Sequence, residues 1–476
     1  MRDSMENQPL HPVDGHIDAL KLSDHDLYAL MDQTVDMAKS YWGTLEERSA
    51  YPEVSGRLTS ALFSRPWTED GLGRGVFNDF SLIADSSRPS GARFFGYIFG
   101  SGEPIGALAD WMAAVLNQNV TAWRSAPAAV SIERAVVGWL AEAIGCPDFT
   151  GSLCGGGSAA NLMGLAMARE AKLAANQTGA RAGIVYASDQ VHMSISKAVA
   201  LLGIGRDNLR LIPVDDHFRM RTDLLRIAIA EDRAAGRFPI AIVATAGTTT
   251  SGAVDPLSQI ADIARREKLW MHVDGSYGGL AALATSALFE GMSQADSLSL
   301  DAHKWLYQTM DCGCLLFRDA AMARTAFSYS GDYARSLNQD PDESFAFFDE
   351  SIELSRRFRA LKLWMSLQYH GRRAFRDAIR RDIGHAELLS ELVTIDPDLE
   401  LLAPTSLSVV CFRHRGGNNE EILRRVISRG RVYLSNDTIR GEFALRACFV
   451  NHRTSADDVR LIIAEIKAAA EDLDLA

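Results

Sequence analysis

Six short runs with the pattern of buried strands, in the middle of the chain, constrain its fold more than any other feature. Segments with apolar side chains at helical spacing lie between several of them. Strands that alternate with helices in this way are typical of an α/β domain with a mostly parallel sheet. In such a sheet, ligands bind at the carboxyl ends of the strands. The six expected strands are residues 183–188, 209–214, 239–246, 269–274, 296–301 and 312–317.

The rest of the chain divides into an N-terminal and a C-terminal part. Residues 1–104 are predicted to form an N-terminal helical arm that packs on a partner subunit, with residues 1–20 loosely attached. Residues 105–365 form the large α/β domain. Residues 366–476 are predicted to be a small α+β domain, because short strand patterns alternate there with helical ones.

Composition excludes several classes of function. The chain has 476 residues, and its net charge of -12 argues against nucleic acid and anionic membranes as main partners. No apolar run approaches the length of a membrane span, and the first residues lack the apolar core of a secretory signal. Six cysteines in a chain of this length do not suggest a disulfide framework. We expect a cytoplasmic protein without a metal site.

Lys304 stands in an unusual setting between two expected strands, in the sequence DAHKWLYQTMDCG. Lysine is almost never fully buried unless it is paired. A lysine that has lost its hydration can instead form a Schiff base with an aldehyde cofactor. For Lys304 taken alone, a surface loop is the more common explanation.

Three other motifs stand at strand ends or helix starts. GSLCGGGSAANL, at 151–162, opens a helix but follows no strand that we recognise, and its glycines with Ser158 are typical of an anion site. HVDGSYGG, at 272–279, places Asp274 at the end of a strand, where a carboxylate can hold a protonated ring nitrogen. SDQVHMSISKA, at 188–198, places His192 where it can face a ligand ring. Each motif alone also fits an ordinary structural role: a flexible loop, a turn cap and a helix start.

Together, these motifs resemble the group II pyridoxal-phosphate decarboxylases, the family that includes aromatic-L-amino-acid decarboxylase. A phosphate cradle, a ring-stacking histidine, an acid for the pyridine nitrogen and a Schiff-base lysine are the parts that this cofactor requires. ATAGTTTSGAVD and SRRFRALKLW add to the resemblance, which runs from about residue 94 to about residue 466.

The resemblance implies a type I fold whose large domain binds pyridoxal 5′-phosphate (PLP), and a homodimer with active sites at the subunit interface. It implies that Lys304 carries the cofactor, that Asp274 pairs with the ring nitrogen and that His192 stacks on the ring. Gly157, Ser158 and His303 are expected near the phosphate, and Ser297 and Thr249 are further candidates for cofactor contacts. The implied reaction is decarboxylation of an L-amino acid to an amine and CO2.

One departure from the family concerns the proton donor. Family decarboxylases carry a tyrosine on a loop before SRRFR, and the matching position here is Phe347. In relatives with this exchange, the carbanion reacts with oxygen, which gives an aldehyde, ammonia and hydrogen peroxide. An aldehyde synthase is therefore an alternative function, with Phe347 as its decisive residue. Tyr329 and Tyr333 lie upstream and are alternative proton donors. A third possibility is that Phe347 only packs the loop.

A second departure concerns the substrate. The sequence GARFFGYIF has Gly91 and Ala92 where the family has His-Pro, although Phe94, Tyr97 and Phe99 still supply aromatic surface. The matching pocket positions Asn119 and Thr121 are polar, and they precede Trp123, which is kept. Polar groups in a pocket can reverse substrate preference. We expect an aromatic amino acid as substrate. A non-catalytic scaffold is the alternative from another class, and Lys304, Asp274 and His192 argue against it.

Overall fold

The computed structural model describes residues 20–66, 69–179, 182–329 and 340–474. The expectation that residues 1–20 are loosely attached therefore falls almost wholly outside the described residues. The chain divides into two compact units. The smaller unit is Met1–Arg48 with Pro52–Pro89, and the larger is Ser49–Tyr51 with Ser90–Ala476.

The smaller unit is helical. It contains α1 (Asp24–Thr44), α2 (Gly56–Phe63) and α3 (Asp79–Asp85). The hydroxyl of Ser23 accepts a hydrogen bond from the backbone N–H of Asp26, which caps α1. Many large apolar side chains of this unit are exposed, so it buries little core of its own. They are Leu20, Leu22, Leu27, Tyr28, Met31, Leu58, Phe63, Leu72, Val76, Phe80, Leu82 and Ile83.

The larger unit is built around a seven-stranded sheet in the order β1-β7-β6-β5-β4-β2-β3. The pairs from β3 to β6 are parallel, whereas β7 pairs antiparallel with both β6 and β1. The predicted mostly parallel α/β sheet is thus confirmed. The strands are β1 (Thr150–Cys154), β2 (Gly183–Ser188), β3 (Leu209–Ile212), β4 (Phe238–Thr245), β5 (Trp270–Asp274), β6 (Ser297–Asp301) and β7 (Gly313–Phe317).

β1 corrects the sequence analysis, because it is a strand that directly precedes the glycine loop. Its partner β7 covers it along its whole length, from Thr150 opposite Phe317 to Cys154 opposite Gly313. The strand escaped recognition because Thr-Gly-Ser-Leu-Cys has few β-branched or aromatic residues. Tertiary pairing overrides that weak propensity.

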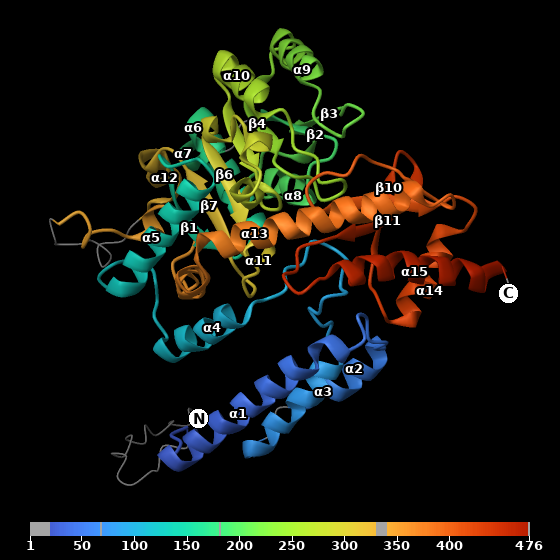
Figure 1. The fold of residues 1–476 in the computed structure, drawn as a ribbon. Coiled ribbons are helices and arrows are strands. Elements are labelled where there is room, and N and C mark those ends of the chain that lie inside the picture. The colour runs from blue at the N-terminus through green and yellow to red at the C-terminus, as the bar shows by residue number, and fades with distance from the viewer. Residues whose placement is uncertain (1–19, 67–68, 180–181, 330–339, 475–476) are drawn as a thin grey trace, which may run out of the picture. The chain divides into compact units, whose positions relative to one another are not determined.

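Helices cover both faces of this sheet (Figure 1). Alternate residues of a strand point to opposite faces. Accordingly Tyr186 and Ile242 belong to the core with α5, α9 and α10, whereas Val185 and Val243 belong to the core with α6, α8 and α12. The helices are α4 (Pro104–Leu116), α5 (Pro127–Ala143), α6 (Gly157–Leu173), α7 (Ala175–Thr178), α8 (Met193–Leu201), α9 (Thr222–Ala234), α10 (Leu257–Glu267), α11 (Ala302–Trp305) and α12 (Ala320–Phe327).

The C-terminal part is a small α+β structure, as predicted. Its four-stranded antiparallel sheet has the order β10-β11-β9-β8 and packs with helices over a third core. Its long helix α13 is interrupted at Gly371, which has φ 73° and divides it into two helices. The division into domains at residues 104 and 365 stays a prediction. The elements are α13 (Ala360–Ile395), β8 (Leu399–Leu401), β9 (Val409–His414), α14 (Asn419–Arg429), β10 (Ser435–Ile439), β11 (Glu442–Cys448) and α15 (Ala456–Asp474).

None of the helices in the described ranges is both long and apolar enough to cross a membrane.

A buried ion pair ties the SRRFR segment to the large domain. The side chains of Arg356 and Glu133 are both completely buried and in contact. Arg356 also donates to the carbonyls of Val120 and Leu153, at 2.8 Å each. Glu133 in turn accepts from the backbone N–H of Leu153 at 2.9 Å. The pair therefore joins α5, β1 and the segment before α13.

Removing one partner of such a pair leaves a buried charge without compensation, which costs several kcal/mol. We expect Glu133→Gln to lower the free energy of unfolding by about 3 kcal/mol, measured by urea denaturation. Glu142→Gln on the same helix is the control. The side chain of Glu142 is 69% exposed, and its ion pair with Arg372 is long, at 3.7 Å. Equal stability of the two variants would contradict the importance of the buried pair.

Candidate active site

A cavity of about 280 Å³ lies at the carboxyl ends of the parallel strands, where an α/β sheet binds its ligands. The predicted cofactor residues Gly157, Ser158, His192, Thr249, Asp274, His303 and Lys304 all line it. The other lining residues are Gly155, Gly156, Asn161, Thr245, Gly247, Ser276, Tyr277 and Asp301.

The glycine loop between β1 and α6 forms one wall of this cavity. Gly156 has φ 107°, a conformation that side chains rarely tolerate. The backbone N–H of Gly157 donates to the Asp301 carboxylate at 3.0 Å. A Cβ on Gly157 would lie 2.4 Å from the Ser276 hydroxyl, so only glycine fits there. The loop leads into α6, a long helix whose N-terminus is suited to bind a phosphate.

Lys304 is half-buried on the short helix α11, directly after β6. Trp305 anchors this helix, because it is fully buried and stacks on Tyr277 with ring centroids 5.8 Å apart. On the preceding side, His303 Nδ1 lies 2.5 Å from the Asp301 carboxylate. These contacts on either side fix the backbone from which Lys304 enters the cavity.

The carboxylate of Asp274 is buried at the end of β5. One oxygen accepts from the Ser276 N–H at 3.1 Å and from the Ser299 hydroxyl at 3.0 Å, and the other accepts from the Asn161 amide at 2.9 Å. Burial alone raises the pKa of Asp274, but the hydrogen bonds from Ser276 and the nearby His272 and Lys304 outweigh it and hold the pKa below its usual range. Asp274 therefore stays ionised inside the protein.

His192 lines the cavity from the position directly before α8, where it caps the helix. Its Nδ1 contacts the Ser194 hydroxyl at 2.8 Å and accepts from the Ser194 N–H at 3.3 Å. Burial lowers the pKa of His192, and the charge of Lys304 adds to this effect against the opposing charge of Asp274. The imidazole is therefore neutral near pH 7, as suits a ring that stacks on another ring.

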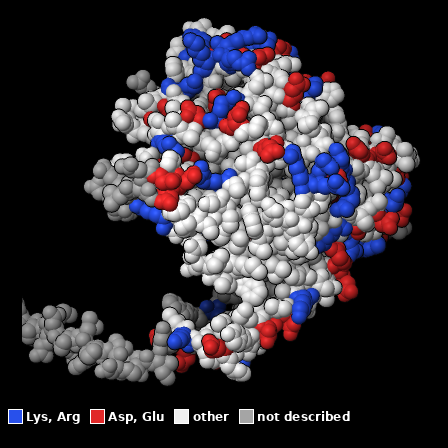
Figure 2. Space-filling view, turned by 60° about the vertical axis from the view of Figure 1, so that its left-hand side comes forward, with Lys and Arg blue, Asp and Glu red and all other residues white. Residues whose placement is uncertain are grey.

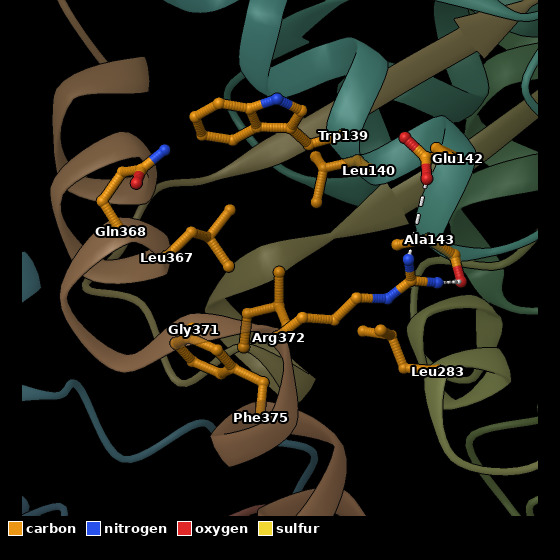
Figure 3. A pocket seen from close by; sticks show the side chains of 11 residues that line it. Trp139, Leu140, Glu142, Ala143, Leu283, Leu367, Gln368, Gly371, Arg372 and Phe375 are labelled. Atoms are coloured by element: carbon orange, nitrogen blue, oxygen red, sulfur yellow. Dashed lines mark hydrogen bonds and ion pairs between the residues drawn. The ribbon is translucent and has the colours of Figure 1, made fainter.

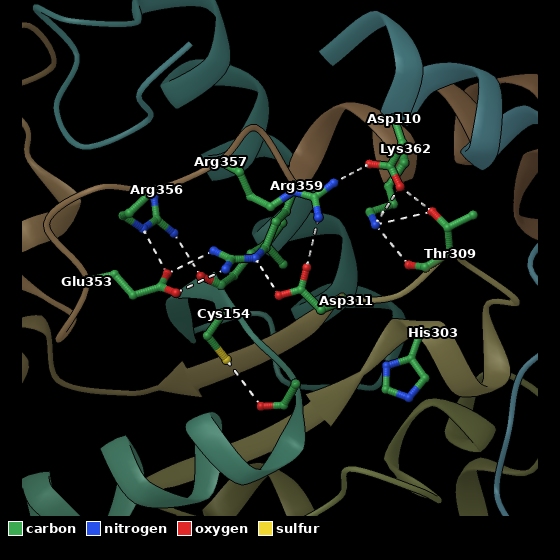
Figure 4. Close-up of polar contacts among 12 residues, drawn as sticks. Asp110, Cys154, His303, Thr309, Asp311, Glu353, Arg356, Arg357, Arg359 and Lys362 are labelled. Atoms are coloured by element: carbon green, nitrogen blue, oxygen red, sulfur yellow. Dashed lines mark hydrogen bonds and ion pairs between the residues drawn. The ribbon is translucent and has the colours of Figure 1, made fainter. Parts of the chain in front are cut away.

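A network of ion pairs in the SRRFRALK segment lies behind the glycine loop (Figure 4). The Arg359 guanidinium contacts Glu353 at 2.8 Å and Asp311 at 3.1 Å. A Cβ on Gly155 would lie 3.3 Å from the Asp311 carboxylate, so the network touches the loop from outside. Lys362, fully buried, extends the network to Asp110 at 2.9 Å.

Another cavity, of about 300 Å³, lies between α5 and α13 (Figure 3). Its walls are mostly apolar, with Trp139, Leu367 and Phe375 among them. Its charged residues, Glu142 and Arg372, lie at its margin and are mainly exposed. It lacks a converging set of reactive groups, so we place the active site at Lys304.

Comparison with known proteins decides the family. The family model "Pyridoxal-dependent decarboxylase conserved domain" matches residues 83–415. The chain belongs to this family. It is 33% identical to an aromatic-L-amino-acid decarboxylase of Bacillus atrophaeus, over 96% of this chain and 98% of that one. It is 34% identical to a phenylacetaldehyde synthase of Petunia hybrida, over 74% and 75% of the chains. A solved structure of Oryza sativa TDC with PLP and tryptamine has a TM-score of 0.89, with 28% identity over 95% of this chain and 99% of that one.

This pyridoxal-dependent decarboxylase is thus a carboxy-lyase of the aromatic decarboxylase group, and its cofactor is PLP. The residues that line the cavity fit this cofactor, independently of the comparisons. A lysine, a buried ionised carboxylate and a side-chain-free loop at a helix start converge in it. The buried hydroxyl of Thr245 also lines it and has no hydrogen-bond partner within the described part of the protein.

Ser297 lies away from the cavity, contrary to the prediction. Its hydroxyl contacts Trp270 Nε1 at 2.9 Å and His272 Nδ1 at 2.8 Å. Ser299, two residues further along β6, is the serine that contacts Asp274. Both point to the same face of the sheet, but Ser297 lies deeper beneath α6. The resemblance made Ser297 a candidate for a cofactor contact, and the structure places its side chain outside the cavity wall.

The predicted substrate residues form two separate groups, and neither lines the cavity. The first group packs on Tyr433, with ring centroids 4.8 Å away for Phe94 and 5.8 Å for Tyr97. Phe99 packs against Phe94 with the rings tilted and their centroids 5.6 Å apart. The chain directly after this group lies against a residue of the cavity wall, because a Cβ on Gly100 would lie 1.7 Å from the carbonyl oxygen of His303.

The second group lies beside the segment that contains Phe347. Asn119 accepts from the Arg356 N–H at 2.9 Å. The backbone carbonyl of Thr121 accepts from the backbone N–H of Phe347 at 2.9 Å, and the backbone N–H of Trp123 donates to the Phe345 carbonyl at 3.0 Å. Phe347 itself is completely buried, with the Arg356 guanidinium 4.2 Å from its ring centroid. Tyr329 is 98% exposed, and Tyr333 lies outside the described residues.

Sequence reasoning missed several residues of the cavity wall. Asp301 and Ser276 stand within motifs that were recognised, so proximity to Lys304 and Asp274 was an available signal. Asn161 also lies in a recognised motif, but one turn inside the helix, where no sequence pattern distinguishes it from a surface residue. Thr245 and Gly247 lie in the recognised motif ATAGTTTSGAVD, shortly before the predicted residue Thr249.

The close fit at Gly157 gives a test of the cradle. Gly157→Ala would push a methyl group into the Ser276 hydroxyl and displace the loop, so we expect PLP to bind at least about tenfold more weakly, measured by titration of the apoprotein. Gly138→Ala in α5 is the control, because no atom lies within 4 Å of its added Cβ. Unchanged PLP affinity of Gly157→Ala would show that the loop does not hold the cofactor.

Proposed function

We propose that the cavity binds PLP with the residues that line it in defined roles. Lys304 holds the cofactor covalently, Asp274 pairs with the ring nitrogen and His192 stacks on the ring. The phosphate lies at the glycine loop, near Gly157, Ser158 and His303, and Thr249 contacts the cofactor from the β4 side. The convergence of Lys304, ionised Asp274 and the glycine loop in one cavity carries this proposal.

The proposed chemistry follows from these roles. Bound PLP supplies an electron sink for the pair released when the Cα–carboxylate bond breaks. The negative charge of Asp274 keeps the proton on the ring nitrogen. The glycine loop and His192 would hold the ring in one orientation, which fixes where the substrate stands relative to it.

We propose an aromatic L-amino acid as the substrate, and its amine and CO2 as the products. The aromatic group of Phe94, Tyr97 and Phe99 supports this choice, because its chain segment lies against the backbone of His303. The names of the relatives at 33% and 34% identity also support it.

A second candidate function is the aldehyde synthase, in which amino acid, oxygen and water give aldehyde, CO2, ammonia and hydrogen peroxide. Phe347 at the position of the family tyrosine and the similarity to a phenylacetaldehyde synthase favour it. The burial of Phe347 under Arg356 supports a packing role instead. We therefore place simple decarboxylation first.

Product analysis separates the two candidates. Cofactor-loaded protein is incubated in air with a panel of L-amino acids, and amine, aldehyde and peroxide are quantified together. We expect amine without peroxide from an aromatic substrate. Aldehyde and peroxide in equal amounts would reverse the order of the candidates, and Phe347→Tyr should then restore the amine. Lys304→Ala should abolish either product, and product formation by that variant would contradict the proposed site.

We also propose that the active protein is a homodimer. The described residues of α4 expose a row of large apolar side chains: Leu108, Trp111, Met112, Val115 and Leu116. Monomeric proteins rarely expose so many together. Figure 2 likewise shows a broad area without charged side chains on one face. The second substrate group, with Thr121 and Trp123, lies outside the cavity of its own chain, which suits a role in the site of the partner subunit.

A charge placed on α4 tests this proposal. Val115 is 73% exposed, so Val115→Glu should cost the monomer little and should weaken a dimer that buries α4. We expect a shift toward monomer in sedimentation analysis at low concentration. Ile395→Glu, at a residue that is 77% exposed at the end of α13, is the matched control. A variant Val115→Glu that remains as dimeric as the control would exclude α4 from the interface.

A further inference from the structure

A chain of side-chain hydrogen bonds runs beneath α6 from β5 to the cavity. Trp270 Nε1 contacts the Ser297 hydroxyl at 2.9 Å, and this hydroxyl contacts His272 Nδ1 at 2.8 Å. His272 Nε2 contacts the Asn161 amide oxygen at 2.9 Å. The Asn161 amide nitrogen then donates to Asp274 at 2.9 Å. All five side chains are buried, with residue exposures between 0% and 6%.

The two ends of this chain fix the direction of every hydrogen bond in it. The Trp270 indole can only donate, and an ionised carboxylate such as Asp274 can only accept. Asn161 directs its amide nitrogen to Asp274, so its amide oxygen faces His272 Nε2, which must carry a hydrogen. Burial lowers the pKa of His272 to about 4, so the ring is neutral and its Nδ1 is an acceptor. Ser297 therefore accepts from Trp270 and donates to His272 Nδ1. Asn161 accepts from His272 and donates to Asp274.

Asn161 also directs a branch to His192. Its amide nitrogen donates a second hydrogen bond to the Ser194 hydroxyl at 3.0 Å. His192 Nδ1 accepts from the Ser194 backbone N–H at 3.3 Å, so it carries no hydrogen of its own. The Ser194 hydroxyl, which accepts from Asn161, therefore gives its hydrogen to His192 Nδ1, 2.8 Å away. His192 therefore carries its hydrogen on Nε2, the ring nitrogen that Ser194 does not use.

A glycine in α6 makes room for this chain. A Cβ on Gly164 would lie 2.5 Å from His272 Nδ1 and 3.2 Å from the Ser297 hydroxyl. Glycine inside a helix is less favourable than alanine by about 1 kcal/mol. Here it permits α6 to approach His272 closely, so that Asn161, one turn earlier, reaches both His272 and Asp274.

We propose that Asn161 is a positioning residue that couples the two cofactor-facing side chains, orienting the Asp274 carboxylate through one amide hydrogen and setting the tautomer of His192, through Ser194, with the other. This inference rests on the proposed roles of Asp274 and His192. The branched set of hydrogen bonds holds the Asp274 carboxylate, which accepts from the ring nitrogen, and at the same time keeps the hydrogen of His192 on Nε2. Loss of Asn161 disturbs both, whereas loss of Ser194 disturbs only His192.

The test uses the full-length protein loaded with PLP. Three quantities are measured for each variant: the dissociation constant of PLP, the pH midpoint of the visible absorption band of the bound cofactor, and kcat against pH. We expect Asn161→Leu to weaken PLP binding at least about tenfold, to shift the midpoint and to change the pH profile. Ser194→Ala should change only the pH profile. Ser196→Ala is the control and should match the native protein, because Ser196 lies on α8 with Ser194 but takes no part in these hydrogen bonds.

A purely structural role would lower the melting temperature and leave the spectral midpoint unchanged, so a native midpoint and native PLP affinity in Asn161→Leu would overturn the proposal. If that variant does not fold, Asn161→Asp takes its place, because it keeps the shape but sets a second carboxylate beside Asp274. An unchanged midpoint in that variant would overturn the proposal equally.

Asp274→Asn separates this inference from the proposed function. A shifted midpoint in Asp274→Asn together with native values in Asn161→Leu would reject the coupling alone. Native values in Asp274→Asn would instead show that Asp274 does not hold the cofactor ring, and the proposed site itself would fail.

Discussion

The buried negative charge of Asp274 is the feature on which the active site depends. A carboxylate without partners would be costly inside a protein and would take up a proton. Here both oxygens accept hydrogen bonds, from Ser276 and Ser299 on one side and from Asn161 on the other. These donors come from the turn after β5, from β6 and from α6. The charge can persist only while these three elements stay together, so the fold and the chemistry have the same requirement.

The parallel part of the sheet brings the reactive groups together. β4, β5 and β6 end side by side with Thr245, Asp274 and Asp301, and Lys304 follows one short turn later. β1 and β7, which run antiparallel to each other, close the sheet on the side where the glycine loop begins. The site is therefore assembled from strand ends that are remote in sequence. The hydrogen-bonded pairing of the strands sets the positions of its side chains.

Residues with strong local signals could be predicted from the sequence, and those that depend on depth or tertiary contact could not. Asp274 ends one expected strand and Lys304 closely follows another, so the strand pattern placed them at one edge of the sheet, whereas the strand before the glycine loop was missed. Ser297 shows the limit, because side-chain alternation gives its face of the sheet but not its distance from the edge. Asn161 was missed because its role arises only where α6 crosses His272. Phe347 shows the same limit for a residue identified by alignment: the motif gave its position, but not its burial against Arg356.

The central claim is that this cavity holds PLP on Lys304. It is tested most directly by reducing the cofactor-loaded protein with borohydride and finding the modified residue by peptide mass spectrometry. The account predicts a single pyridoxyl group on the peptide that contains DAHKW, at Lys304. A pyridoxyl group on another lysine, or none after reduction, would contradict it.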